Sequence, residues 1–119
     1  ELVADANRHA ELIGIMNFAE RVEAVMPQMV LNGTETAGEV AEYFALHERT
    51  LRRYLKEEQR SFQGILNQTR CELAQQLLGN TSLSVERIAT VLRYRDPNAF
   101  SRAFRNWSRL SPTQWRALQ

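Results

Sequence analysis

Arginines and short polar side chains share one side of a predicted helix in the stretch DPNAFSRAFRNWSRLSP, residues 96–112. At helical spacing, four such residues lie together and away from the aromatic ones: Asn98, Ser101, Arg102 and Arg105. A guanidinium pairs with a phosphate or the edge of guanine through two hydrogen bonds, and an amide pairs similarly with adenine. Residues 97–109 contain no acid, whereas a solvated helix face usually interleaves Lys and Glu. This side of the helix is therefore predicted to contact a nucleic acid.

The opposite side of the same helix is apolar. Its residues recur at the i, i+3, i+4 and i+7 spacing of a buried stripe: Phe100, Ala103, Phe104 and Trp107. Ordinary core packing is the preferred explanation of such a stripe. We therefore predict that Phe100, Phe104 and Trp107 belong to the core and hold the helix without touching the partner.

A second basic helix is predicted at residues 48–57. Leu51, Tyr54 and Leu55 face inward at helical spacing, and the outward side carries the positive charge. Glu48 in the first turn is predicted to have a structural role, because a negative charge there favours the helix dipole. The predicted nucleic-acid contacts of this helix are Arg49, Thr50, Arg52, Arg53 and Lys56.

Charge is divided unevenly along the 119 residues, although the net charge is only +1. Residues 1–46 carry two bases and eight acids, a net charge of −6, and residues 47–119 carry thirteen bases and six acids, a net charge of +7. Only one of the fifteen bases is a lysine. This asymmetry favours a polyanionic partner.

Helical periodicity dominates the sequence and no convincing alternating strand is present, so we predict an all-α fold. A first helix is predicted from about Ala4 to Leu31, kinked or restarted at Pro27 and ended by Asn32-Gly33. Further helices are predicted at residues 37–44, 62–78, 85–92 and 97–108, and from residue 112 through Trp115.

Short polar residues are predicted to cap these helices. Thr36 and Glu39 form a capping box, in which each side chain satisfies a free backbone amide. Gly79-Asn80 is predicted to end helix 62–78. The other predicted N-caps are Ser61, Ser84, Asp96 and Ser111.

One unit occurs twice, because residues 39–56 align with residues 87–105. The matched positions are Val40-Ala41 with Ile88-Ala89, Leu46 with Tyr94, Leu51 with Phe100, Arg53 with Arg102, and Leu55 with Phe104. Each copy is a short helix, a tight turn and a longer basic helix, the arrangement in which the second helix enters a major groove. The linker helix 62–78 is about 25 Å long and major-groove faces recur about every 34 Å, so the two basic helices are predicted to read adjacent grooves.

A spaced set of residues extends over most of the chain: Arg49-Thr50-Leu51, Arg53, Leu55, Ser61-Phe62, Arg70, Ala74, Leu77-Leu78, Ile88-Ala89, Tyr94, Asp96, Phe100, Arg102, Phe104, Trp107, Ser111-Pro112 and Trp115-Arg116. As a set, these residues resemble the DNA-binding domain of the AraC/XylS transcriptional regulators, from about residue 18 to residue 117. The resemblance implies a bacterial transcription factor, usually an activator, with an effector-binding or dimerising domain N-terminal to this one. The implied partners are double-stranded promoter DNA and RNA polymerase.

The family's base-reading positions are carried over residue by residue. They fall on Arg49, Arg52, Arg53, Pro97, Asn98, Ser101 and Arg102, with backbone contact implied for Arg105. Pro97 has no side-chain hydrogen bond to offer, so we expect at most van der Waals contact with a thymine methyl group or a sugar.

Several residues depart from the family's pattern or have expected structural roles. At turns where the family often has glycine, this chain has Ala45, Arg93 and Arg109. These turns are predicted to be reshaped. A non-glycine residue at positive φ costs on the order of 1 kcal/mol, so Arg109 is predicted either to be strained or to cap its helix differently. His47 stands where a serine is frequent and is predicted to weaken that helix cap, with a phosphate contact as the less favoured alternative. Arg70 is expected to dock the linker helix through a backbone carbonyl or an acid, and Cys71 to pack as a small hydrophobe.

Other classes of function have little support in the sequence. The single cysteine excludes an internal disulfide, and His9, His47 and Cys71 lack the spacing of metal ligands. No glycine-rich phosphate loop and no Ser/His/Asp or Cys/His arrangement indicates an enzyme, so we expect no catalysis, cofactor or metal. No apolar run is long enough to span a membrane, and a cytoplasmic, nucleoid-associated protein is expected.

The predicted organisation has four parts. These are an N-terminal helical segment at residues 1–31, a first helix-turn-helix at 32–60, a linker helix at 61–80, and a second helix-turn-helix with a C-terminal helix at 81–119. The chain opens on Glu1, so we expect a fragment of a longer protein whose sensor or partner domain is missing. The alternative function is a helical protein-interaction module that contacts RNA polymerase or a partner domain and has only non-specific DNA affinity.

Overall fold

Seven helices and no strand make up residues 16–119, the part of the chain that the structure, a computed structural model, describes. The helices are α2 (Phe18–Asn32), α3 (Ala37–Tyr43), α4 (Glu48–Glu57), α5 (Phe62–Asn80), α6 (Val85–Val91), α7 (Pro97–Ser108) and α8 (Pro112–Ala117). The all-α prediction is confirmed. Within the described range, no helix is both long enough and apolar enough to cross a membrane. The predicted beginning of the first helix near Ala4 lies outside the described residues, as does His9.

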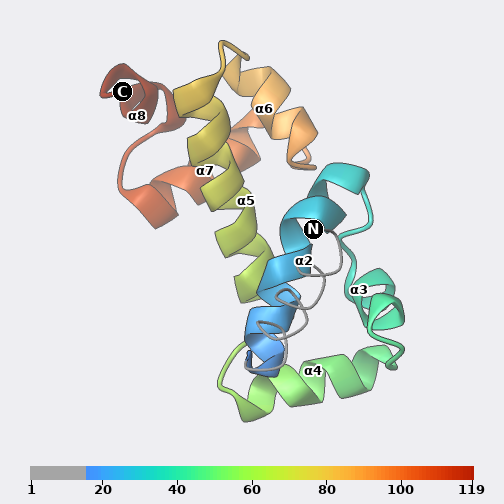
Figure 1. Cartoon of the computed structure of the whole chain (residues 1–119). Helices are drawn as coiled ribbons and strands as arrows, with labels where there is room; N and C mark the ends of the chain where they lie inside the picture. The colour runs from blue at the N-terminus through green and yellow to red at the C-terminus, as the bar shows by residue number, and fades with distance from the viewer. Residues whose placement is uncertain (1–15) are drawn as a thin grey trace, which may run out of the picture.

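Helix α5 joins two helical units, as the prediction of two helix-turn-helix units on a linker helix requires (Figure 1). One unit contains α2, α3 and α4, and the other contains α6, α7 and α8. Both units pack on α5, through α2 in the first and through α6, α7 and α8 in the second. The 19 residues of α5 give it a length of about 28 Å. The basic helices α4 and α7 therefore belong to different ends of the molecule, whose longest extent is 40 Å.

Short polar side chains begin five of these helices as predicted. Ser61, Ser84, Asp96 and Ser111 each accept a hydrogen bond from the backbone N–H three residues later. Thr36 also accepts from the N–H of Glu39, at 3.2 Å. The predicted second half of that capping box is wrong, because the Glu39 carboxylate accepts from the Thr36 hydroxyl and not from its amide.

The structure differs from the predicted helix boundaries at Pro27 and at Gly79. Helix α2 continues through Pro27, so the predicted restart there is wrong. Proline removes one backbone hydrogen bond, and burial of Met26 and Val30 in the core offsets that loss. Helix α5 continues through Gly79 to Asn80, and a Cβ at Gly79 would lie 3.5 Å from the ring of Trp115. The helix therefore ends within the predicted Gly79-Asn80 pair, at Asn80, and Gly79 itself is helical and packs beside a tryptophan.

The predicted end of α2 is confirmed. Gly33 has φ of 76°, and its N–H donates to Met29 and Val30 while the N–H of Thr34 donates to Met29 at 2.8 Å. Only glycine adopts this left-handed backbone without strain.

One correction concerns the core. Leu51, Leu55, Phe100 and Phe104 are fully buried, but Trp107 is 41% exposed, so its predicted place in the core is wrong. Trp115 of α8 packs edge-on against Phe104, with ring centroids 6.2 Å apart, and closes the core at that point. Trp107 lies one turn beyond Phe104 and lines a shallow surface hollow beside α5.

Candidate nucleic-acid interface

Helix α4 has one buried and one basic side. Leu51 and Leu55 lie in the core, Tyr54 is half-buried, and the ring of Phe18 packs edge-on against Tyr54 at 5.4 Å. Arg49, Arg52, Arg53 and Lys56 are exposed, and Thr50 is half-buried. The arginines and the lysine thus form a basic face that a polyanion can approach without disturbing the core.

Two arginines of this face are paired with acids of the same helix. Arg52 Nε lies 3.1 Å from Glu48 Oε2, and its guanidinium lies 5.9 Å from the ring centroid of Phe62. Arg53 Nε lies 3.9 Å from Glu57 Oε1. Glu48 was predicted only to favour the helix dipole, and its contact with Arg52 is an addition to that role. Exposed pairs of this kind contribute about 0–1 kcal/mol, so a phosphate or a base can replace the acid.

Helix α7 presents a second polar face. Asn98, Ser101, Arg102 and Arg105 line one shallow hollow, and Pro97 is exposed at the first helical position. The predicted residues of this helix are therefore neighbours on one surface. Phe100 and Phe104 anchor the other side of the helix in the core.

Asp96 fixes the beginning of α7. Its Oδ1 accepts from the N–H of Ala99 at 2.7 Å. That hydrogen bond, together with the charges of Arg95 and Arg102, holds the pKa of Asp96 below its usual value. The carboxylate therefore stays ionised at neutral pH and keeps capping the helix.

Arg70 positions α7 relative to the linker helix, as expected from the sequence. Its Nε donates to the carbonyl of Leu92 at 2.9 Å, and its Nη2 donates to that of Arg93 at 3.3 Å. Its guanidinium also lies 4.9 Å from the ring centroid of Tyr94, which in turn packs against Phe100 at 5.4 Å. The linker helix thus holds the turn that leads into α7.

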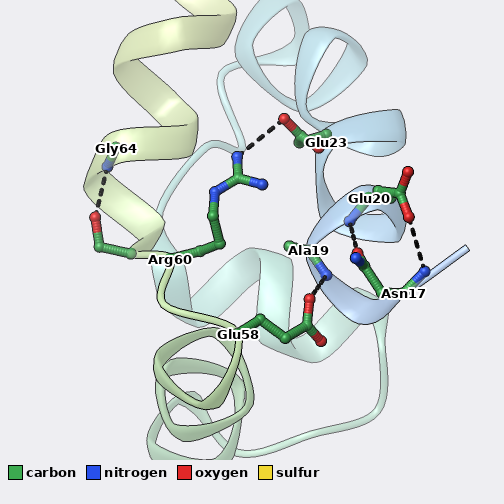
Figure 2. Close-up of polar contacts among 8 residues, drawn as sticks. Asn17, Ala19, Glu20, Glu23, Glu58, Arg60 and Gly64 are labelled. Carbon is green, nitrogen blue, oxygen red and sulfur yellow. Dashed lines mark hydrogen bonds and ion pairs between the residues drawn. The ribbon is translucent and has the colours of Figure 1, made fainter.

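Glu58 and Arg60 position α4, and sequence reasoning missed both roles. Glu58 accepts from the N–H groups of Phe18 and Ala19 at 3.2 and 3.0 Å, and so caps the beginning of α2 from the end of α4. Figure 2 shows the hydrogen bond with Ala19. Arg60 Nη2 lies 3.0 Å from Glu23 Oε2 on α2. These contacts join residues about 40 positions apart in sequence, and no local pattern indicates them.

Left-handed residues flank both basic helices. The three predicted departures from glycine all have positive φ: Ala45 at 58°, Arg93 at 67° and Arg109 at 72°. Gln59, at 59°, was not predicted. Ala45 and Gln59 lie on either side of α4, and Arg93 and Arg109 lie on either side of α7. The turns at Ala45 and Arg93 therefore keep the left-handed backbone, so their predicted reshaping is wrong, and Arg109 adopts the strained one of its two predicted forms.

His47 and Cys71 have the predicted structural properties. His47 is the N-cap of α4 and makes no side-chain capping hydrogen bond, so this cap is weak. Cys71 is 2% exposed, and burial raises the pKa of its thiol to about 11. A thiol of this kind stays protonated at neutral pH and is a poor nucleophile.

Sequence comparisons identify similar proteins. A family model described as a helix-turn-helix domain matches residues 40–118. A helix-turn-helix-type transcriptional regulator of Mycobacterium tuberculosis is 39% identical over 82 residues, which cover 69% of this chain and 23% of that protein. The regulator VqsM of Pseudomonas aeruginosa is 40% identical over 76 residues, 64% of this chain and 23% of VqsM. The matched part of the chain thus spans less than a quarter of the length of these relatives.

Solved structures give the same result for the fold. A DNA-binding transcriptional dual regulator of Escherichia coli K-12 superposes with a TM-score of 0.79 at 25% identity, over 86% of this chain and 91% of that one. The C-terminal domain of AraT, a response regulator of Geobacillus stearothermophilus, superposes with a TM-score of 0.74 at 28% identity, over 88% of both chains.

Proposed function

This chain belongs to the AraC/XylS family of helix-turn-helix transcriptional regulators, and from that premise we propose that it reads double-stranded promoter DNA with α4 and α7 in adjacent major grooves. The family consists of DNA-binding regulators, not of enzymes. The finer proposal concerns sequence specificity and the residues that provide it.

The observation that carries the proposal is the repetition of one two-sided helix. Leu51 and Leu55 anchor α4 in the core, and Phe100 and Phe104 anchor α7 at the matching positions. Each anchored helix leaves its arginines on the exposed side. A fixed helix with an exposed row of polar and guanidinium groups is suited to the major groove, which admits one α-helix.

We assign different roles to the exposed residues. Base contacts are assigned to Arg49, Arg52 and Arg53 on α4 and to Asn98, Ser101 and Arg102 on α7, because their side chains match the edges of guanine and adenine. Contacts next to these base contacts are assigned to Thr50, Lys56 and Arg105. The contact assigned to Arg105 is with a phosphate. Pro97 is assigned van der Waals contact with a thymine methyl group or a sugar.

The dimensions support simultaneous contact by both helices. Successive major-groove faces of B-DNA lie about 34 Å apart, and the longest extent of the described residues is 40 Å. A single copy of the chain is therefore large enough to contact two neighbouring grooves on one side of a duplex.

The remaining proposals concern the longer protein. Since this chain matches only 23% of the length of similar regulators, we propose that an effector-binding or dimerising domain precedes it. We also propose that the protein acts in the bacterial cytoplasm as an activator that contacts RNA polymerase.

Selection from a random duplex library tests the proposal. The selection uses the 119-residue chain at near-physiological salt, so that attraction to phosphate does not conceal base readout. We expect enrichment of two short elements centred about one helical turn apart. Arg52→Ala should lose the preference at one element and Arg102→Ala at the other, which makes each variant the control of the other.

Two results contradict the proposal in different ways. Enrichment of one element means that one of the two units only grips the backbone. Salt-sensitive binding without any enrichment means that the domain is a protein-interaction module with non-specific DNA affinity.

A further inference from the structure

A side chain of the second unit lies against the end of α2 in the first unit. A Cβ built on Gly33 would lie 2.9 Å from Arg93 Nη2 and 3.0 Å from Arg93 Cζ. The guanidinium therefore packs directly on the Cα of Gly33, in space that only glycine leaves free. Figure 1 shows the connection between α6 and α7 beside the end of α2.

The charge of Arg93 suits this location. The C-terminal end of a helix carries a partial negative charge, which a nearby cation stabilises. Helix α2 has no basic residue in its last turn. Arg93 supplies a cation to this helix end from a position 60 residues further along the chain.

The backbone of Arg93 is fixed as well. Its carbonyl accepts a hydrogen bond from Arg70 of α5, and its N–H donates to the carbonyl of Thr90 at 3.1 Å. The turn before α7 is therefore fastened to α5 through Arg70 and to α2 through the side chain of Arg93.

Arginine is an unfavourable choice for the backbone of this turn. Its φ of 67° lies in the left-handed region, which glycine adopts without strain. The contact with Gly33 is one that glycine at position 93 cannot make.

We propose that Arg93 is a positioning residue that fixes the orientation of α7 relative to α4, and thereby sets the spacing of the two DNA elements that the protein selects. The inference rests on the proposed function, in which α4 and α7 both read DNA. It adds a determinant of spacing that touches neither element.

Arg93→Gly separates this role from ordinary stability. The substitution relieves the left-handed strain, so the second unit should remain folded, while the contact with Gly33 disappears. Arg109→Gly is the matched control, because it removes the same charge and the same kind of strain (φ 72°) at the other end of α7.

The first measurement needs no DNA. Spin labels on cysteines introduced at the exposed residues Glu42 of α3 and Glu86 of α6 report the distance between the units by pulsed electron paramagnetic resonance. The native Cys71 is buried and escapes labelling. Arg93→Gly should broaden the distance distribution about twofold, as expected when a hinge is released, and Arg109→Gly should leave it unchanged.

The second measurement uses duplexes whose two selected elements are one base pair closer or further apart than in the selected site. Each added base pair rotates one element by about 34° relative to the other. The unsubstituted chain and Arg109→Gly should lose about tenfold in affinity on these duplexes, and Arg93→Gly less than about threefold.

Several results overturn the inference. One is a distance distribution as narrow in Arg93→Gly as in the unsubstituted chain. Another is an equal loss of the spacing preference in Arg109→Gly. A third is a uniform loss of DNA affinity at every spacing in Arg93→Gly, which indicates that Arg93 contacts a phosphate. If the unsubstituted chain shows no spacing preference, the two-groove proposal fails, and the width of the distance distribution alone then decides whether Arg93 holds the units together.

Discussion

Arg52 on α4 and Arg102 on α7 are both assigned base contacts but differ in their surroundings. Arg52 lies between the Glu48 carboxylate at 3.1 Å and the ring of Phe62. Arg102 lines an open hollow with Asn98, and it takes part in none of the ion pairs found within residues 16–119. Arg52 must therefore exchange an acid for DNA, whereas Arg102 only loses water.

This difference predicts the effect of Glu48→Gln. Removing the carboxylate frees Arg52 and takes a negative charge away from the approaching phosphates, so affinity for the selected duplex should rise about threefold, as expected for an exposed pair. Fluorescence anisotropy against the same duplex measures the change. Glu42→Gln on α3 makes the same change in net charge away from the pair, and an equal gain in that variant contradicts the explanation.

Cys71 and Tyr94 predict a loss of stability in alkali. Burial raises the pKa of Cys71 from 9.0 to about 11 and that of Tyr94 from 10.0 to about 12. The unfolded chain therefore releases these protons at lower pH than the folded chain, and stability falls as pH rises from about 9 towards 11. Tm measured at about pH 7, 9 and 10.5 should decline less steeply in Cys71→Ala than in the unsubstituted chain. The difference in Tm between the two proteins at pH 7 isolates the cost of losing the packed side chain. Parallel declines contradict a role of the thiol.

At the scale of elements, α7 is held by a short aromatic cluster. Phe104 is fully buried and contacts Trp107 and Trp115, with ring centroids 6.2 Å away in each case. Trp107 keeps one side open to solvent. Phe104 and Trp107 therefore contribute unequally to the stability of the second unit, although both fit the same helical stripe.

Substitution to alanine should reveal that inequality. Phe104→Ala leaves a cavity in the core and should cost about 3–5 kcal/mol, enough to unfold the second unit. Trp107→Ala removes a half-exposed ring and should cost clearly less. Urea denaturation of both variants provides the free energies of unfolding. A larger cost for Trp107 contradicts the observed burial.

Local signals in the sequence predict the helices well and their packing poorly. The caps at Ser61, Ser84 and Asp96 depend on residues three positions apart, so the sequence alone reveals them. The packing of Gly79 and the exposure of Trp107 depend on where α8 lies. No periodicity contains that information.

The same distinction applies to the candidate site. The residues on the exposed faces of α4 and α7 follow from helical spacing, so the sequence alone predicts them. Their contacts with DNA remain predictions. The residues that orient these faces act across the chain: Glu58 on α2, Arg70 on the turn before α7, and Arg93 on Gly33. Of these, only Arg70 was anticipated, because the family resemblance drew attention to it.

Over the whole molecule, charge is separated along the chain. In the described part, α2 and α3 carry acids such as Glu20, Glu39 and Glu42, whereas the excess of bases begins with α4. A duplex is attracted to one part of such a molecule and repelled by the other, so electrostatics orient the encounter before any base is read.

Salt dependence should separate the residues that hold the phosphates from those that read bases. The logarithm of the binding constant falls linearly with the logarithm of salt concentration, by about 0.9 for each phosphate neutralised. Arg105→Ala should flatten this slope by about 1 and weaken binding to selected and random duplexes alike. Arg102→Ala should keep most of the slope but cost about 1–3 kcal/mol on the selected duplex only, because it removes the proposed base contact. Binding titrations with both duplexes at salt concentrations from about 50 to about 200 mM measure the slope and the affinity. If both variants flatten the slope equally and lose affinity equally on the two duplexes, the arginines of α7 contact only the phosphate backbone. Specificity must then come from α4 or from the N-terminal domain that we propose.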